Sequence, residues 1–293
     1  MTSVAHRVAL VTLAATFVLI LFGGLVTNTG AALAVPDWPS TFGYTLFSFP
    51  WSQMIGGIFY EHSHRLIGAL VGLLTLGLAV TLWRAGGRLR WLGLAAVLGV
   101  VIQGVLGGLR VVLLADTLAI VHGSLAQAFF GLLAAIAFLT SRAAERPPRD
   151  LDPSLRPLTL AAAAVVYLQI VLGALLTHAG WLGLHWAGAV AVFGVVPVVT
   201  ARLRRSGDPV ATAGARTLLA LLGAQLLLGV GAYFARFSSL WIPGGQTTML
   251  VLPVVHRLVG SLILGATVVL ALRAAAPRAR AAEHHEAPAL ALT

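Results

Sequence analysis

Four histidines stand near the beginning of four apolar stretches, and each is followed four residues later by a glycine or an alanine. The pairs are His64 with Gly68, His122 with Ala126, His185 with Ala189, and His256 with Gly260. Because residues i and i+4 share a helix face, each imidazole would have a flat clearing beside it. A flat macrocycle with an axial imidazole ligand needs such a clearing. We therefore interpret the four histidines as axial ligands of two bis-histidine hemes.

Other roles for these histidines are open. A lone histidine in a membrane helix usually hydrogen-bonds to another helix, so each one taken singly has a structural alternative. A zinc or copper centre is a weaker alternative, because it would need three or four convergent ligands and no clearing. The chain contains no cysteine. A disulfide, a thiolate nucleophile, an iron–sulfur cluster and a thiolate zinc site are therefore excluded.

One carboxylate accompanies one of the four histidines. Glu61 precedes His64 by three residues, whereas no carboxylate stands three residues before His185 or His256. An ion pair with Arg65, four residues further on, would satisfy both charges at the membrane boundary. A catalytic carboxylate at the edge of a heme held by His64 is the other interpretation. The asymmetry indicates that one heme is transformed while the other carries electrons.

The composition is that of a polytopic membrane protein. The chain of 293 residues is 59% hydrophobic and 10% charged, with a mean hydropathy of +0.95, whereas soluble proteins have about 25% charged residues. Apolar runs of about 20 residues predict membrane-spanning helices. The first run is expected to be a retained helix rather than a cleaved signal peptide. The eight predicted spans are Val8–Val26, Glu61–Trp83, Trp91–Val112, Leu118–Thr140, Leu158–Thr177, Leu182–Ala201, Thr217–Ala235 and Pro253–Leu272.

The arginines predict the orientation of these helices. All 19 basic residues are arginine, and 15 of them fall before the first span, after the last, or in alternate loops. The positive-inside rule explains the net charge of +10 better than nucleic-acid binding does, and places both termini in the cytoplasm. The remaining arginines lie at outer helix ends, where lipid phosphates would also accept them. With His178, they are the candidate partners of heme propionates: Arg65, Arg110, Arg236 and Arg257.

An internal repeat predicts the architecture. A glycine-containing segment ends each odd-numbered span, and three of its four copies carry a glutamine four residues before the first glycine: Gln103, Gln169 and Gln225. Each copy is followed by a span with a histidine near its outer start. We therefore expect an all-α membrane protein with eight transmembrane helices, arranged as two pseudo-symmetric four-helix bundles. The predicted bundles comprise residues 1–148 and 149–275, followed by a disordered cytoplasmic tail at 276–293.

Four segments give the chain a resemblance to the heme A synthase family of membrane monooxygenases. They are Gly23-Gly24-Leu25-Val26-Thr27-Asn28-Thr29-Gly30, Val35-Pro36-Asp37-Trp38-Pro39, Glu61-x-x-His64-Arg65 and Val255-His256-Arg257-x-x-Gly260, with His122 and His185 between them. Two features depart from the family's pattern. The cysteine pair that many bacterial members carry in the first outer loop is absent, and the arginine that often precedes the residue at His178 is replaced by Thr177.

The resemblance implies an enzyme and its sites. The N-terminal bundle would bind the substrate, heme O, through His64 and His122, and the C-terminal bundle would hold a heme b cofactor through His185 and His256. The reaction would oxidise one porphyrin methyl group to a formyl group by successive hydroxylations, with Glu61 as the catalytic residue. The product would be heme A for terminal cytochrome oxidase. The long first outer loop, which contains Trp38, Phe42, Tyr44, Phe47 and Trp51, is expected to form a lid over the substrate heme.

The sequence and the resemblance also lead to expectations about where the protein resides and what it contacts. The expected setting is the cell inner (cytoplasmic) membrane, in contact with lipid, with the heme sites towards the outer face. Candidate partners are an electron donor, a heme O synthase, an oxidase assembly protein and a second copy of the chain. Two alternatives use the same histidines without chemistry on either heme. One is a diheme b electron-transfer protein linked to quinol, and the other is a non-catalytic heme-binding factor for oxidase assembly.

Overall fold

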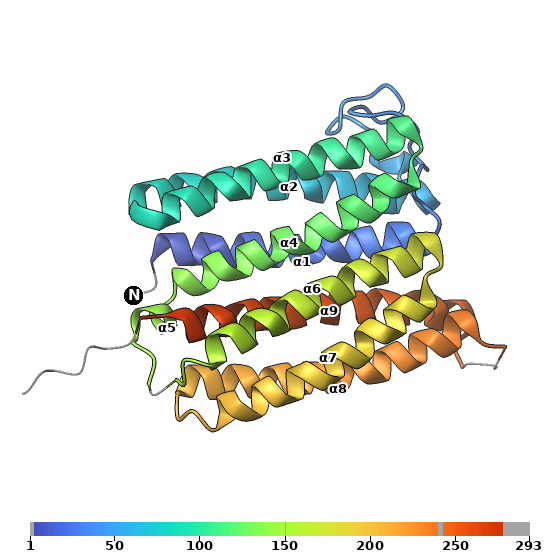
Figure 1. Cartoon of the computed structure of the whole chain (residues 1–293). Coiled ribbons are helices and arrows are strands. Elements are labelled where there is room, and N and C mark those ends of the chain that lie inside the picture. The colour runs from blue at the N-terminus through green and yellow to red at the C-terminus, as the bar shows by residue number, and fades with distance from the viewer. Residues whose placement is uncertain (1–2, 150, 240–242, 278–293) are drawn as a thin grey trace, which may run out of the picture.

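The structure of the chain, a computed structural model, describes residues 3–149, 151–239 and 243–277. Most of the predicted tail, 276–293, lies outside the described residues. Every long secondary-structure element of the described residues is a helix (Figure 1). The helices are α1 (Val4–Asn28), the short 3-10 helix η1 (Trp51–Gln53), α2 (Gly56–Ala85), α3 (Gly87–Leu113), α4 (Asp116–Leu139), α5 (Arg142–Glu145), α6 (Leu155–Ala179), α7 (Leu182–Arg204), α8 (Pro209–Phe237) and α9 (Gly245–Ala275).

The prediction of eight membrane-spanning helices is confirmed. Within the described residues, eight helices are long and apolar enough to cross a membrane. Three begin five or more residues earlier than predicted. Helix α2 begins at Gly56, so Glu61 lies inside the helix rather than at its head, and α8 and α9 each begin eight residues before the predicted start. At the start of α8 a cap marks the boundary that hydropathy misses, because the Asp208 carboxylate accepts from the N–H of Ala211.

The eight long helices form two neighbouring sets. In the first set α1 contacts α2 and α4, while α3 contacts α2 and α4; in the second, α6 contacts α7 and α9, while α8 contacts α7 and α9. The sets meet through α1, α4, α6 and α9. The connection between α4 and α6, which we call the joint, contains the short helix α5 (Figure 1). The domain boundaries at 148 and 275 and the pseudo-symmetry of the two sets stay predictions.

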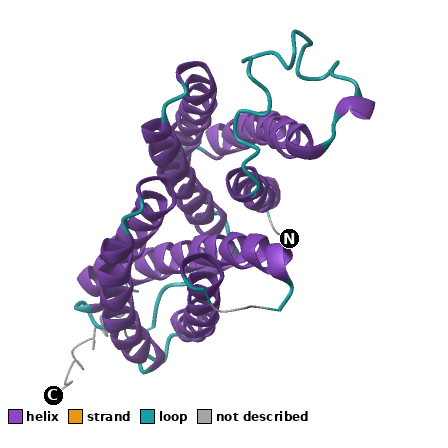
Figure 2. Cartoon of the chain, turned by 90° about the vertical axis from the view of Figure 1, so that its right-hand side faces the viewer, coloured by secondary structure: helices purple, strands orange, loops and turns teal. Residues whose placement is uncertain are grey.

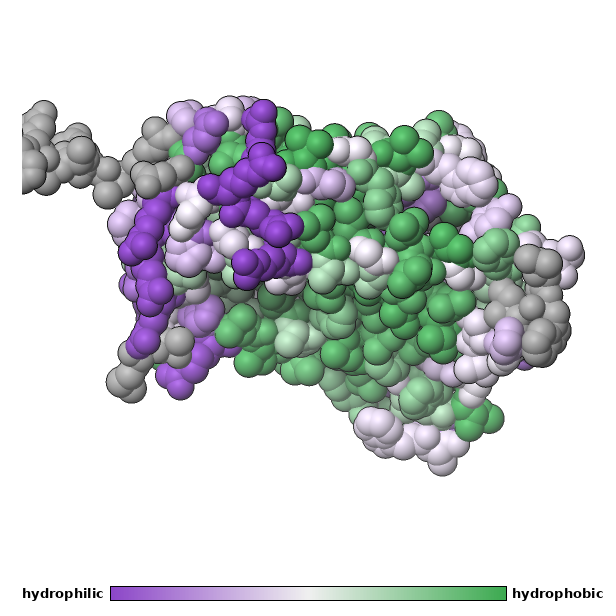
Figure 3. All heavy atoms as spheres, turned by 90° about the horizontal axis from the view of Figure 1, so that it is seen from below, coloured by the Kyte–Doolittle hydropathy of each residue, from purple (hydrophilic) through white to green (hydrophobic). Residues whose placement is uncertain are grey.

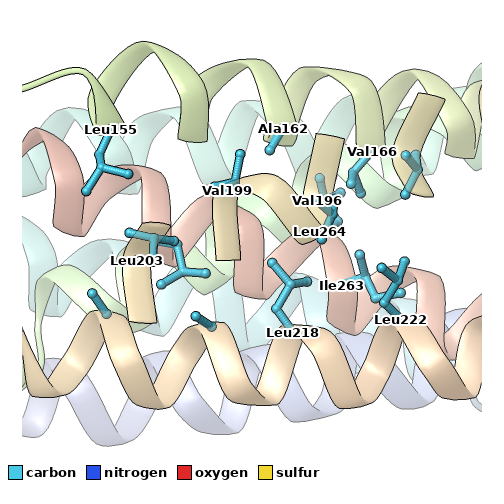
Figure 4. Close-up of a cluster of buried hydrophobic side chains, with 14 of the residues drawn as sticks. Leu155, Ala162, Val166, Val196, Val199, Leu203, Leu218, Leu222, Ile263 and Leu264 are labelled. Carbon is cyan, nitrogen blue, oxygen red and sulfur yellow. The ribbon is translucent and has the colours of Figure 1, made fainter. Parts of the chain in front are cut away.

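Each set has its own cluster of buried apolar side chains. One cluster joins α1 to α4 through residues such as Ala9, Val71 and Leu133. The other joins α6 to α9, and Figure 4 shows its leucines, isoleucines and valines facing one another between the helices. Glycines bring α4 and α9 close together, since a Cβ on Gly265 would lie 3.4 Å from the Phe130 ring. Small residues at helix contacts are expected where lipid, not water, surrounds the protein.

The surface separates into a polar end and an apolar belt. Hydrophilic side chains gather at the end that carries the start of α1 and the end of α9, and apolar side chains cover the middle (Figures 1 and 3). The long connection between α1 and α2, residues 29–55, projects from the opposite end and reaches sideways from the bundle (Figures 1 and 2). We call residues 29–55 the outer loop. The chain is a multi-pass membrane protein by these features.

A buried ion pair fixes the joint between the two sets. Arg273 of α9 donates to both oxygens of Asp208, at 2.6 Å and 3.1 Å, and both side chains are at most 2% exposed. Arg273 also donates to carbonyls of the joint, at Ala143, Arg146 and Pro147. In the sequence, Arg273 was one of the arginines that predict the orientation of the helices in the membrane. In the structure its side chain is buried and forms an ion pair. Burial alone would raise the pKa of Asp208, yet the hydrogen bonds from Arg273 and from backbone N–H groups lower it.

Candidate functional site

All four predicted histidines line one cavity. Its volume is about 1560 Å³, and it extends through both sets of helices, with His64, His122, His185 and His256 in its wall. Pockets for one small molecule usually measure about 300–1,000 Å³, so this cavity has room for more than one. The small residues four positions after the histidines also line it, as predicted: Gly68, Ala126, Ala189 and Gly260.

Each imidazole lies against a glycine of the preceding long helix. A Cβ built on that glycine would come within 3.0–3.4 Å of the ring's Cε1 atom. Any larger residue would therefore displace the ring. The glycines are those of the internal repeat, and the pairs are Gly23 with His64, Gly107 with His122, Gly173 with His185, and Gly229 with His256. The repeat predicted close helix approach at these glycines but not that the histidines would fill the space they leave.

The two histidines of the second set are spaced for a shared metal ion. The ring centroids of His185 and His256 are 6.3 Å apart, with the ring planes inclined at 68°. Bonds of about 2 Å from each imidazole nitrogen to one metal, with roughly 1 Å from nitrogen to ring centroid, give about 6 Å. His256 Nδ1 is buried without a hydrogen-bond partner, as is His64 Nδ1 in the first set. This pair therefore fits bis-imidazole ligation of an iron ion.

Glutamines of the repeat contact three of the four rings. Gln169 Nε2 lies 3.2 Å from His185 Nδ1, and Gln225 Nε2 lies 3.2 Å from His256 Nε2. The amide of Gln103, oriented to satisfy both of its ends, lies 3.0 Å from Nδ1 of the His122 ring. Metal-binding histidines usually donate their second ring N–H to an acceptor. The Oε1 atoms of Gln169 and Gln225 are buried without a partner and would supply one after an amide rotation.

His64 differs from the other three. The residue four positions before its facing glycine is Leu19, which has no amide to orient the ring. A histidine without a glutamine partner and a carboxylate three residues before a histidine thus both occur in the first set of helices and not in the second. The sequence contained the signal for the glutamines, because their spacing from the repeat glycine is constant, but it did not indicate which side chain they would meet.

Glu61 is paired. One carboxylate oxygen accepts from Arg65 at 2.7 Å, and the other accepts from the backbone N–H of Val35 at 3.0 Å. The side chain of Glu61 is 6% exposed, and the residue also lines the cavity beside His64. The predicted ion pair with Arg65 is therefore present. The catalytic interpretation of Glu61 stays a prediction.

Arg65 holds the outer loop onto α2. Besides Glu61, its guanidinium donates to the backbone carbonyls of Val35, Asp37 and Ser40, at 2.7–3.0 Å. Together with the bond to Glu61, these contacts occupy all the N–H donors of Nη1 and Nη2. A structural role for Arg65 is thus evident, while its role as a propionate partner stays a prediction.

His62 provides a second tie between α2 and the outer loop. It is 1% exposed, its Nδ1 lies 3.1 Å from the hydroxyl of Thr41, and its ring packs against Phe49. Sequence reasoning gave no role to Thr41 or Phe49. Residues from 29–55 can be matched to α2 only once the loop is folded, and a loop has no hydrophobic period to read.

Only part of the outer loop covers the cavity. Trp38 lines the cavity and lies against Gly108 of α3, and Phe47 also reaches the wall. Phe42 and Tyr44 instead pack on Phe49. Trp51 does not line the cavity and is 77% exposed. Fewer aromatic side chains of the outer loop therefore cover the cavity than predicted. The loop reaches sideways from the bundle and does not fold over the helix ends (Figure 2).

Asp37 shapes the tip of the outer loop and predicts its acid sensitivity. Its carboxylate accepts from the N–H groups of Phe42 and Gly43 and from the hydroxyl of Ser40, at 2.6–2.9 Å. Burial raises the pKa of Asp37, but these hydrogen bonds together outweigh it and lower the pKa to about 2. A lowered pKa means that the carboxylate stabilises the loop above about pH 4, and that this contribution disappears as the pH falls towards 2.

Hydrogen exchange checks this expectation. Protection of the Phe42 and Gly43 amides should stay constant from neutral pH to about pH 4 and fall below it. In Asp37→Asn protein the protection should be low at every pH. Loss of protection in the parent protein already near pH 6 would contradict the role given to Asp37.

The other predicted propionate partners lie at the cavity without partners of their own. Arg110, Arg236 and Arg257 line it, and within the described residues none has a hydrogen bond or an ion pair with another side chain. Arg257 reaches across to α1, where a Cβ on Gly24 would lie 3.6 Å from its Nη1. His178 also lines the cavity. Three cations without counter-charges beside an apolar cavity are suited to bind anionic groups.

A metal centre built from protein side chains alone is not found. No group of three or more histidine, cysteine, aspartate or glutamate side chains converges in the part of the chain that the structure describes. The four histidines are instead arranged in two pairs. That arrangement suits ligands on opposite faces of a macrocycle, which supplies the remaining donors itself.

Comparisons with known proteins agree with these features. The profile of a family described as "Cytochrome oxidase assembly protein" matches residues 6–182. The chain is 27% identical to the heme A synthase of Shouchella clausii over 180 residues, 59% of this chain and 58% of that protein. It is 29% identical to the heme A synthase of Geobacillus kaustophilus over 175 residues, 57% and 54% of the two chains.

The matches cover part of each protein. For the heme A synthase of Alkalihalophilus pseudofirmus the identity is 34% over 99 residues, 32% of each chain. The chain thus covers less than two thirds of the length of these relatives. The family profile reaches from α1 to the beginning of α7, and so includes His64 and His122. Because it covers more than half of the 293 residues, the chain belongs to the cytochrome oxidase assembly protein family.

Proposed function

We propose that the protein is a heme A synthase, a membrane oxidoreductase that converts one methyl group of heme O to a formyl group. The observation that carries the proposal is the set of four imidazoles in one cavity, each against a glycine. The relatives named heme A synthase support it. Heme A would be supplied to terminal cytochrome oxidase, in keeping with the family's description.

The two histidine pairs are assigned different hemes. His64 and His122 would hold the substrate, heme O, and His185 and His256 would hold a resident heme b. Glutamines beside both histidines of the second pair support a fixed ligand set there, since such partners orient metal-binding histidines. The single ring without a glutamine, His64, suits a site that exchanges its heme. Heme b would supply one-electron transfer.

The chemistry needs two hydroxylations of the same carbon. Each inserts one atom of O₂ into a methyl C–H bond, consumes two electrons and two protons, and releases the second oxygen atom as water. The resulting geminal diol loses water to give the formyl group. An electron donor outside this chain supplies the electrons. We assign proton transfer at the cavity edge to Glu61, because it is the carboxylate that lies beside the substrate-site histidine.

The remaining assignments follow from charge. Arg110, Arg236, Arg257 and His178, with Arg65, are proposed to meet the heme propionates at the outer face. Both termini are proposed to lie in the cytoplasm, because the start of α1 and the end of α9 lie at the hydrophilic end of the molecule (Figures 1 and 3). The protein would then reside in the inner membrane, with a heme O synthase, an oxidase assembly protein or a second copy of the chain as partners.

Heme analysis of cells tests the proposal. The protein is expressed with a heme O synthase in a host that makes no heme A, and the hemes are extracted and identified. Heme A or its hydroxymethyl precursor is expected only when both proteins are present. Two heme b groups per folded chain with neither product would favour the diheme electron-transfer protein and contradict the proposal.

A further inference from the structure

The cavity extends between α2 and α3 to the membrane-facing surface. Its wall there consists of Gly72, Leu73 and Leu76 of α2 with Val101 and Gly104 of α3. The three larger side chains are 51–64% exposed, on helices that cross the membrane. At these positions the cavity that His64 and His122 line is therefore bordered by side chains that are also exposed on α2 and α3. We call these five residues the α2–α3 groove.

At the positions that the internal repeat makes equivalent, the second set of helices has large side chains in place of the two groove glycines. Gly72 stands eight residues after His64, and the residue eight after His185 is Phe193. Gly104 stands three residues before the repeat glycine of α3, and the residue at that position of α8 is Leu226. The corresponding place in the second set is thus occupied by a phenylalanine and a leucine, both in the cavity wall.

The two glycines leave real space. A Cβ built on Gly72 or on Gly104 would meet no atom within 4 Å, so neither glycine is needed for helix contact. Glycine destabilises a helix relative to alanine, and no contact within the described residues requires a glycine at either position. The buried, unpartnered Nδ1 of His64 independently indicates that the cavity receives a ligand beside His64, in the same set of helices.

We propose that the α2–α3 groove binds the isoprenoid tail of the heme O substrate and is the route by which the tail leaves the cavity. The inference rests on the proposed function. Heme O carries a long apolar chain that heme b lacks, and the groove is apolar and open to lipid. Only the set of helices assigned to the substrate has it, whereas the set assigned to heme b has the space filled.

Paired heme titrations test this proposal. The protein is purified from cells that make only heme b, and heme O or additional heme b is titrated into the His64–His122 site and followed by absorbance. The test variant is Gly72→Leu/Gly104→Leu, whose side chains fill the groove. Gly77→Leu is the matched control, because Gly77 is an exposed α2 glycine with free space around it and no part in the cavity wall.

The expected result is selective. The double variant should raise the apparent Kd for heme O about tenfold or more, as overfilled sites do, and leave that for heme b unchanged. The control should match the parent for both. Equal losses for both hemes, or no loss for either, would overturn the tail assignment. Loss of co-purified phospholipid with unchanged heme O affinity would identify the groove as a lipid site and also overturn it. If the parent bound neither heme, the proposed function itself would fail.

Discussion

Glu61→Gln protein is expected to keep its heme b and to lose formation of heme A. Glutamine retains one oxygen, which can accept either from Arg65 or from the N–H of Val35. The three backbone carbonyls that accept from Arg65 should keep the outer loop attached to α2. It cannot transfer a proton, and a positioned acid or base usually contributes about 10²–10⁴-fold to a rate. The measurement is the amount of heme A and hydroxymethyl precursor per folded protein, with the heme b content determined in parallel.

Two further variants make this prediction specific. His256→Ala should give the opposite pattern, with loss of heme b from the purified protein, because its ring lies 6.3 Å from that of His185 across the proposed iron site. Glu145→Gln, which removes an exposed carboxylate from α5, should change neither readout. Full heme A formation in the Glu61→Gln protein would show that its carboxylate only holds the outer loop.

Arg273→Met protein is expected to be strongly destabilised. The substitution leaves Asp208 buried without its counter-charge and removes the donors to three carbonyls of the joint. Removing one partner of a buried ion pair typically costs about 3–5 kcal/mol of unfolding free energy. Denaturant unfolding in detergent measures this loss.

A second substitution should return part of the lost stability. In Arg273→Met/Asp208→Asn protein the buried charge is gone, and the asparagine oxygen can still accept from the N–H of Ala211 at the start of α8. The exposed Arg204, replaced by methionine, should change the unfolding free energy by no more than about 0.5 kcal/mol. Equal effects of the Arg204 and Arg273 substitutions would show that the burial of Arg273 contributes little.

Much of the fold could be predicted because lipid imposes simple rules on a sequence. Long apolar runs located all eight spanning helices, and the repeat located a histidine in every second one, all four of which line the cavity. The small residue four positions after each histidine lines the cavity as predicted, since helix geometry alone sets that relation.

The features that sequence reasoning missed depend on contacts between distant segments. The outer loop binds α2 through carbonyls that accept from Arg65, and a backbone carbonyl has no signature in a sequence. Arg273 was counted only among the arginines after the last span that predict the orientation. Its partner, Asp208, lies 65 residues away. The sequence showed both the histidines and the repeat glycines. That each histidine ring lies against a repeat glycine depends on how the helices pack, and could not be predicted from the sequence.

The most direct test of the central claim uses the purified protein alone. Protein loaded with heme b is supplied with heme O, O₂ and a chemical electron donor, and the porphyrin products are identified by mass spectrometry. We expect the hydroxymethyl and then the formyl product, absent in the Glu61→Gln protein and absent without O₂. Heme O recovered unchanged from protein that binds it at His64 and His122 would contradict the account and leave a heme-binding assembly factor as the better description.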